Sequence, residues 1–116
     1  MTITEIAHAF SNGEFEKIFP YLDDSIIWTV VEDDEFKGKE AVIEQCKQVS
    51  QYSNAVTTRF ETLYTITEGN KVAVNGTAEF YRDNKRVSFV SACDLYEFDE
   101  NNKLSRITSY CIQKNE

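Results

Sequence analysis

The sequence lacks any cluster of basic side chains. Its 12 Lys and Arg residues stand against 20 Asp and Glu residues, which gives a formal net charge of −8. Proteins that follow a phosphate backbone gather Lys and Arg on one surface, because neutralising phosphates supplies most of the affinity. We therefore expect no nucleic-acid partner.

Long apolar runs are also missing. No stretch approaches the roughly 20 apolar residues that a membrane-spanning helix requires. Residues 1–5 (MTITE) lack the basic and apolar segments of a secretory signal. We expect no membrane partner and a cytoplasmic location.

Cysteine and histidine are scarce. Cys46, Cys93 and Cys111 are odd in number and have no paired spacing, so we expect reduced thiols packed in the core rather than a disulfide framework. With His8 as the single histidine, the chain has no zinc-ligand pattern. It also lacks a glycine-rich phosphate loop and a glycine-flanked nucleophile, so we expect no cofactor, and covalent catalysis is disfavoured.

What the sequence does contain is enough apolar material for one domain covering residues 1–116, since 41% of its residues are hydrophobic. Its back half is a predicted strand at 86–98, an acidic and amide turn, and a returning strand at 104–112. Both sides of the first of these strands are apolar, which indicates that both sheet faces are covered. Asp94 lies on one of these sides between Ala92 and Tyr96. A carboxylate there costs several kcal/mol unless it is hydrogen-bonded, paired or protonated.

The front half predicts three helices. Thr2 and Glu5 match a capping box at the start of the first, and Asn12-Gly13 ends it. The second is short and limited by Pro20, and the third runs from residue 39 to about 52. Alternating or β-branched residues predict three further strands, at 26–31, 56–66 and 72–81. The acidic residues 32–35 are interpreted as a solvated loop in preference to a cation site, because they lack spaced ligands and a glycine.

Strands joined by short turns are antiparallel neighbours, so the back half is predicted to be a meander. The strand at 86–98 would span about 43 Å if straight, at about 3.3 Å per residue, and a domain of this size forces it to coil. The predicted fold is α+β: a cone-shaped, strongly curved antiparallel sheet with three N-terminal helices on its concave face. A cavity at the wide end of the cone would reach Asp94.

Asp94 has two interpretations. It is either a core-edge carboxylate satisfied by Tyr or Ser hydroxyls or a backbone amide, or a pocket acid that exchanges a hydrogen bond or proton with a ligand. His8 lies at the boundary of an apolar helical stripe, where a solvated side chain is favoured over a catalytic base. Aromatic side chains either belong to the core or line the pocket. The candidate pocket residues are Trp28, Phe60, Tyr64, Tyr96 and Tyr110.

The order of these elements resembles the nuclear-transport-factor-2-like superfamily, in particular its bacterial SnoaL-like and ketosteroid-isomerase-like branch. The matching stretches are residues 11–16 (SNGEFE), 22–28 (LDDSIIW), 37–42 (KGKEAV), 94–99 (DLYEFD) and 103–104 (KL). The resemblance implies a cone-shaped α+β barrel that forms a homodimer through its outer sheet face. Such a dimer would account for the second apolar face of the strand at 86–98.

The resemblance also allows ketosteroid isomerase chemistry to be tested position by position. Asp94 occupies the place of the oxyanion-hole aspartic acid of that enzyme, a carboxyl group that an apolar site keeps protonated. The general base falls at Thr29 and the oxyanion-hole tyrosine falls at Ile6. Neither residue can perform those roles, so ketosteroid isomerisation is disfavoured.

Three functions therefore stay open, because this fold hosts many activities. The first is binding of a small hydrophobic or aromatic molecule near Asp94 and Trp28. The second is a cofactor-independent isomerase, cyclase or hydrolase with Asp94 as the catalytic general acid or base. The third is a scaffold that binds another protein through its outer sheet face.

Overall fold

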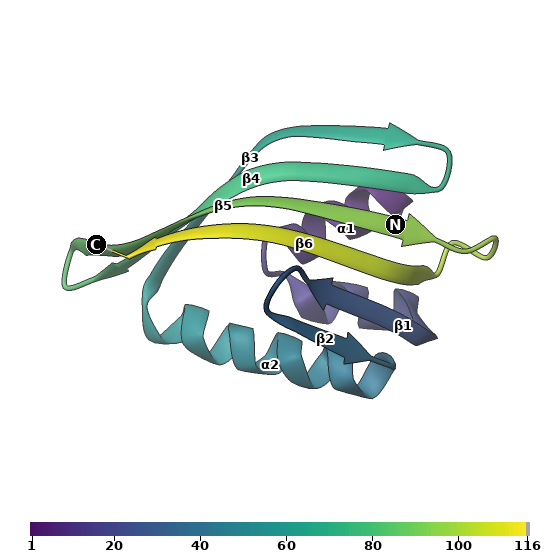
Figure 1. Cartoon of the computed structure of the whole chain (residues 1–116), viewed down its shortest axis with the longest axis horizontal. Helices are drawn as coiled ribbons and strands as arrows, with labels where there is room; N and C mark the ends of the chain where they lie inside the picture. The colour runs from purple at the N-terminus through teal and green to yellow at the C-terminus, as the bar shows by residue number, and fades with distance from the viewer. Residues whose placement is uncertain (116) are drawn as a thin grey trace.

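The computed structural model describes residues 1–115 and consists of one curved sheet with helices on one side (Figure 1). The elements in chain order are α1 (Ile3–Ser11), the 3-10 helix η1 (Phe15–Tyr21), β1 (Leu22–Val30), β2 (Asp34–Lys37), α2 (Lys39–Ala55), β3 (Thr57–Glu68), β4 (Lys71–Arg82), β5 (Lys85–Phe98) and β6 (Leu104–Asn115). The predicted α+β class is confirmed.

The strand order is β2-β1-β6-β5-β4-β3. Strands β3 to β6 form the predicted antiparallel meander. The sheet is mixed rather than wholly antiparallel, because β1 runs parallel to β6. These two strands come from distant parts of the chain, so no short turn fixes their relative direction.

The predicted acidic loop at residues 32–35 is shorter than expected. Glu32 has φ +62° and turns the chain, and the strand β2 already begins at Asp34 and pairs with β1. Acidic residues are poor strand formers in isolation, so the hydrogen bonds of the hairpin with β1 override the local preference. The sequence pattern alone does not predict these hydrogen bonds between β1 and β2.

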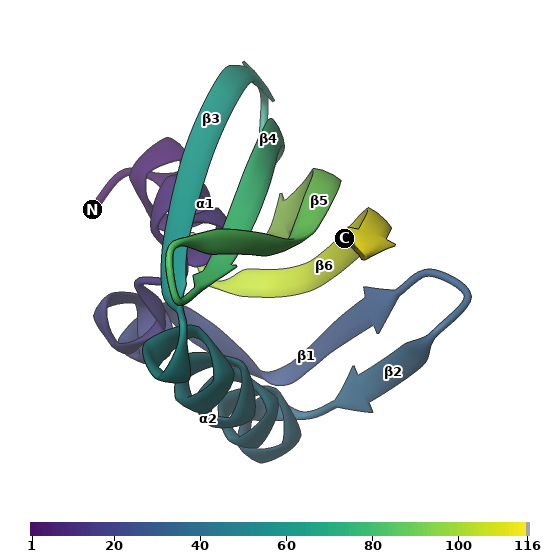
Figure 2. The same cartoon turned by 90° about the vertical axis from the view of Figure 1, so that its left-hand side faces the viewer.

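Helix α1 begins and ends where the sequence predicts. The Thr2 hydroxyl accepts from the Glu5 amide while the Glu5 carboxylate accepts from the Thr2 amide. After Ser11, Gly13 adopts φ +77° and packs against the ring of Phe60, at a distance that leaves little room for a Cβ atom. Both α1 and α2 lie on the same side of the sheet (Figure 2).

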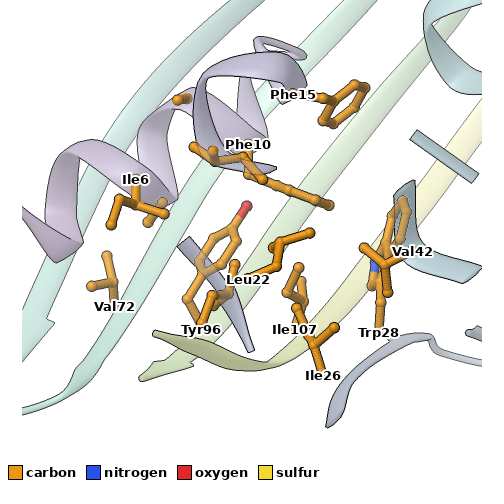
Figure 3. Packing of buried hydrophobic residues seen from close by; sticks show 14 of the residues in the cluster. Ile6, Phe10, Phe15, Leu22, Ile26, Trp28, Val42, Val72, Tyr96 and Ile107 are labelled. Carbon is orange, nitrogen blue, oxygen red and sulfur yellow. The ribbon is translucent and has the colours of Figure 1, made fainter. Parts of the chain in front are cut away.

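The core lies between these helices and the inner face of the sheet. The ring of Phe10 is its centre and makes edge-to-face contacts with Phe15, Trp28 and Tyr96, with centroid separations of 5.1, 5.0 and 5.8 Å. Figure 3 shows the buried Tyr96 ring with its hydroxyl directed toward α1. The Tyr96 hydroxyl thus lies inside the core, beside the end of α1.

A bulge in β3 sets which side chains face this core. The register of β3 against β4 shifts between Thr62 and Tyr64, opposite Gly76. A Cβ at Gly76 would lie 2.5 Å from the backbone oxygen of Glu61, so only glycine fits at this close approach. The bulge at Leu63 turns the following residues of β3 to the opposite face.

The outer face of the sheet stays apolar and is not covered by the helices of the chain. Its exposed large side chains are Leu63, Tyr64, Ile66, Leu95, Tyr110 and Ile112. Within the single chain the helices therefore cover only the inner face, and the sequence-based prediction assigned cover of the outer face to a dimer partner. In residues 1–115, no helix combines the length and the apolar character that crossing a membrane would require.

The cysteines differ from the prediction of three core thiols. Cys46 is buried, but Cys93 is half-buried and Cys111 is exposed. Cys93 faces outward on β5, opposite Tyr110, and Cys111 borders a cavity on the inner side of β6. Their alternation in the strands, rather than the hydrophobicity of the thiol, decides their surroundings.

Candidate functional site

A cavity of about 230 Å³ lies between the end of α1, the helix α2 and the inner face of the sheet. Its walls are mainly apolar and are formed by residues of α1, η1, α2, β1, β3, β4, β5 and β6. The residues that line it include Phe10, Phe15, Trp28, Phe60, Phe80 and Ala92. Asp94 reaches this cavity from β5, so the carboxyl group predicted to point inward does so.

The Asp94 carboxyl group is hydrogen-bonded to the end of α1. Ser11 Oγ donates to Asp94 Oδ2 at 2.8 Å, and the same Ser11 oxygen lies 2.5 Å from the hydroxyl of Tyr96. Because the Ser11 proton is engaged with Asp94, the Tyr96 hydroxyl donates to Ser11. These contacts form a relay from Tyr96 through Ser11 to the carboxylate.

A second relay arrives from β1 and β6. Trp28 Nε1 donates to Ser109 Oγ at 3.0 Å. Ser109 is the cross-strand partner of Asp94, and its hydroxyl group lowers the pKa of that carboxyl group. An indole N–H can only donate, so the Ser109 proton is free to point to the carboxylate.

Burial and hydrogen bonding act on Asp94 in opposite directions. Desolvation raises the pKa of its carboxyl group above the usual value, and the neighbouring hydroxyl groups of Ser109, Ser11 and Tyr96 partly offset that rise by stabilising the charged form. Burial, reinforced by the Asp94 charge, raises the pKa of Tyr96 well above its ordinary value. Tyr96 thus remains a neutral hydroxyl donor.

Cys111 borders the same cavity from β6. Although the residue as a whole is exposed, partial desolvation of its sulfur at the cavity, with smaller contributions from the negative charges of Asp94 and Asp33, raises the pKa of the Cys111 thiol to about 11. A thiol with so high a pKa is a poor nucleophile at neutral pH, because the thiolate is the reactive form.

Three of the five predicted pocket aromatics lie at this site. Trp28 and Phe60 line the cavity. Tyr96 does not line it but is fully buried behind it, with its hydroxyl in the Asp94 network.

Tyr64 and Tyr110 are corrections to the predicted pocket. Their side chains are 63% and 48% exposed and lie on the outer face. Tyr64 is turned outward by the bulge at Leu63, since an extra residue reverses the alternation. Tyr110 pairs with the outward-facing Cys93 in the β5–β6 register.

Sequence reasoning missed Ser11 and Ser109. It named serine hydroxyls as one way to satisfy Asp94 but did not identify which serines. Phe98 pairs with Leu104, and a regular antiparallel register continued from that pair would place Thr108 opposite Asp94. The irregularity at Ser105 shifts the register by one residue, so that Ser109 lies opposite Asp94 instead. Ser11 lies 83 residues from Asp94 and meets it only through tertiary packing.

His8 is placed away from the carboxyl group. Its Nε2 lies 2.5 Å from Thr65 Oγ1, and the ring is half-buried between α1 and β3. The hydrogen bond differs from the solvated state that the sequence favoured. His8 does not line the cavity, so it ties the helix to the sheet instead of serving as a base there.

The comparison with family models matches residues 3–107 to the SnoaL-like domain. This match spans nearly the whole chain. The chain belongs to the SnoaL-like family. A search of curated proteins found no match.

Solved structures agree with this SnoaL-like assignment. A nuclear-transport-factor-2-like protein of unknown function from Cytophaga hutchinsonii has a TM-score of 0.84 and 30% identity, covering 93% of this chain and 94% of its own. An LEH-like epoxide hydrolase from M. tuberculosis has a TM-score of 0.70 and 16% identity, with coverages of 95% and 82%. A putative polyketide cyclase from Sinorhizobium meliloti has a TM-score of 0.65 and 13% identity, with 92% of each chain covered. The last two likenesses concern the fold alone.

Ile6 and Thr29, the other two positions compared with ketosteroid isomerase, have structural roles. Ile6 is packed in the core near Val72 (Figure 3), and Thr29 donates to the Glu35 carboxylate at 3.1 Å. Neither residue lines the cavity of the SnoaL-like protein. The site therefore offers a single buried carboxyl group with hydroxyl and indole support, suited to one hydrogen bond or proton exchange with a bound molecule.

Proposed function

We propose that this SnoaL-like protein binds a small hydrophobic or aromatic molecule in the cavity beside Asp94. The observation that carries the proposal is a cavity of about 230 Å³ with mainly apolar walls and one convergent carboxyl group. Ligand sites typically combine apolar walls with a few placed polar groups. An apolar cavity of about 150 Å³ takes a benzene-sized molecule, so this one suits a single substituted ring.

Two variants on neighbouring positions of β5 test this proposal. Ala92 lines the cavity, whereas Ser91 is exposed on the outer face. A panel of hydrophobic metabolites is screened by ligand-induced thermal shift. We expect Ala92→Leu to abolish the shift by filling the cavity and Ser91→Leu to leave it intact. Absence of any stabilising compound for the unmodified protein would contradict the proposal.

A second candidate is a cofactor-independent isomerase, cyclase or hydrolase that uses Asp94 as general acid or base. The raised pKa of Asp94 favours this candidate, because a carboxyl group tuned upward by burial is suited to proton transfer. We expect Asp94→Asn to remove turnover by at least about a hundredfold while circular dichroism stays unchanged. Full activity of that variant would eliminate this candidate.

A homodimer through the outer sheet face is the quaternary structure we propose. Its support is the exposed apolar side chains of β3, β5 and β6, because monomeric proteins seldom leave large apolar patches in water. A reducing, cytoplasmic location is likewise proposed. Its support is the three cysteines, which are all free thiols.

A further inference from the structure

We propose that the cavity selects ligands by charge, taking a small aromatic or apolar molecule that carries an ammonium group and rejecting the corresponding carboxylate. The inference rests on the proposed function and adds the chemical class of the ligand. The ammonium group would pair with the Asp94 carboxylate, and the apolar part would lie against the aromatic wall.

The charges around the cavity provide the first reason. Among residues 1–115, the residues that line it include no Lys, Arg or His, and Asp94 supplies the carboxyl group that points into it; Glu61 borders the cavity with its backbone, and its exposed side chain lies on the outer face of β3. The whole chain carries a formal charge of −8. An anionic ligand would therefore enter a negative field and find no counter-charge, whereas a cation is attracted over the whole approach.

The direction of the hydrogen bonds provides the second reason. Trp28 must donate to Ser109, which leaves the Ser109 proton for Asp94, and the Tyr96 relay ends on Asp94 through Ser11. Both relays deliver donors to the carboxyl group, as an ionised carboxylate requires. A proton on Asp94 directed to Ser11 would reverse that relay and displace the Tyr96 proton from its acceptor.

The unbalanced charge provides the third reason. A carboxylate has about four acceptor sites, and the two relays occupy only part of them. A buried carboxylate without a cation is destabilised, and the pKa rise that burial imposes on Asp94 reflects that cost. A ligand ammonium supplies both the missing donor and the missing positive charge.

The cavity walls suit such a molecule. Five aromatic residues line the cavity: Phe10, Phe15, Trp28, Phe60 and Phe80. Aromatic rings bury apolar surface and attract cations through their faces. A volume of about 230 Å³ accommodates one ring with a short side chain.

Three probes that differ in one group test the inference: 2-phenylethylamine, 2-phenylethanol and phenylacetate. Their affinities are measured at neutral pH by calorimetry or NMR titration with the unmodified protein. We expect the amine to bind at least about tenfold more tightly than the alcohol, the strength of a charge-assisted hydrogen bond, and phenylacetate to bind most weakly. In Asp94→Asn, the amine should lose its advantage over the alcohol.

A second measurement on the unmodified protein avoids any folding defect of the variant. Amine affinity should rise with pH as Asp94 ionises, while alcohol affinity should change little. Tyr96 and Cys111 face the same carboxyl group, and their raised pKa values keep them neutral over the pH range in which Asp94 ionises. The other charged groups nearby are Glu61, whose side chain lies on the outer face of β3, and Asp33, whose charge acts on Cys111; His8 is engaged with Thr65.

The outcomes separate this inference from the proposed function. If the alcohol or phenylacetate binds as tightly as the amine, charge selection is wrong but ligand binding in the cavity stands. If none of the three probes and no member of the metabolite panel binds, both proposals fail. Amine affinity that is independent of pH and of the Asp94→Asn change would also overturn the inference.

Discussion

The surroundings of the Asp94 carboxyl group are formed by hydroxyl groups from three separate elements. Ser11 ends α1, Tyr96 lies two residues further along β5, and Ser109 sits opposite on β6. Each hydrogen bond stabilises the charged form, while burial opposes it. The carboxyl group is therefore satisfied by the fold yet still open to the cavity, which combines the structural and functional interpretations that the sequence left open.

The raised pKa of Asp94 predicts how stability varies with pH. The folded protein holds the Asp94 proton more tightly than the unfolded chain does, so stability from this group falls as pH rises from the unfolded pKa through the folded one. The free energy of unfolding, measured by urea denaturation, should decline relative to Asp94→Asn from about pH 4 upward, by at most about 1.4 kcal/mol per pH unit. A difference that grows in the opposite direction would contradict the pKa assignment.

The sequence predicted Asp94 as the central residue because its neighbours at period two are apolar, and that inference needs only the strand. Ser109 needed the register of the β5–β6 hairpin, which the irregularity at Ser105 alters. There the Ser105 hydroxyl donates to the Glu97 carbonyl at 3.0 Å. Such a local displacement changes which side chains meet and leaves no mark in the hydrophobic pattern.

In β3, one extra residue changes which side chains point to the inner face of the sheet and which point to the outer face. Before the bulge, Phe60 points into the cavity; after it, Thr65 points inward to His8, and Tyr64 points outward. Strict alternation would have placed Phe60 and Tyr64 together. Gly76, in the middle of the neighbouring strand β4, did indicate the position of the bulge, since glycine in a strand often accompanies one.

Gly76→Ala tests the close approach at this bulge. A Cβ would lie 2.5 Å from the Glu61 carbonyl oxygen, so the backbone must shift. We expect a loss of about 1–3 kcal/mol in the free energy of unfolding, measured by chemical denaturation. Ser91→Ala, on the exposed outer face of β5, serves as the control and should stay within about 0.5 kcal/mol. Equal effects of the two changes would show that the bulge is not tightly packed.

For the molecule as a whole, the two faces of the sheet have different roles. The inner face meets the helices and encloses the cavity, while the outer face presents Leu95, Tyr110 and Ile112 to solvent in the single chain. The sequence predicted two apolar faces on β5, with the face that carries Asp94 turned toward the helices. Which face is covered within the chain depends on the side to which α1 and α2 return.

The homodimer proposal predicts a concentration-dependent mass. Sedimentation equilibrium should give a dimer for the unmodified protein and a monomer for Ile112→Lys, because a buried unpaired charge opposes association. Ile112 is 76% exposed in the single chain, so the change should leave the fold intact. Gln51→Lys, exposed on α2, is the charge-matched control and should remain dimeric. A monomeric unmodified protein would instead favour the scaffold function, with a different protein on this face.

The most direct test of the whole account is an NMR titration of the isotope-labelled protein with 2-phenylethylamine. The account predicts saturable shifts at Ser11, Ala92, Asp94 and Ser109, and none beyond background at the outward-facing Ile66 and Ile112. Shifts confined to the outer face, or no saturable shift at the cavity residues, would contradict a binding site at Asp94.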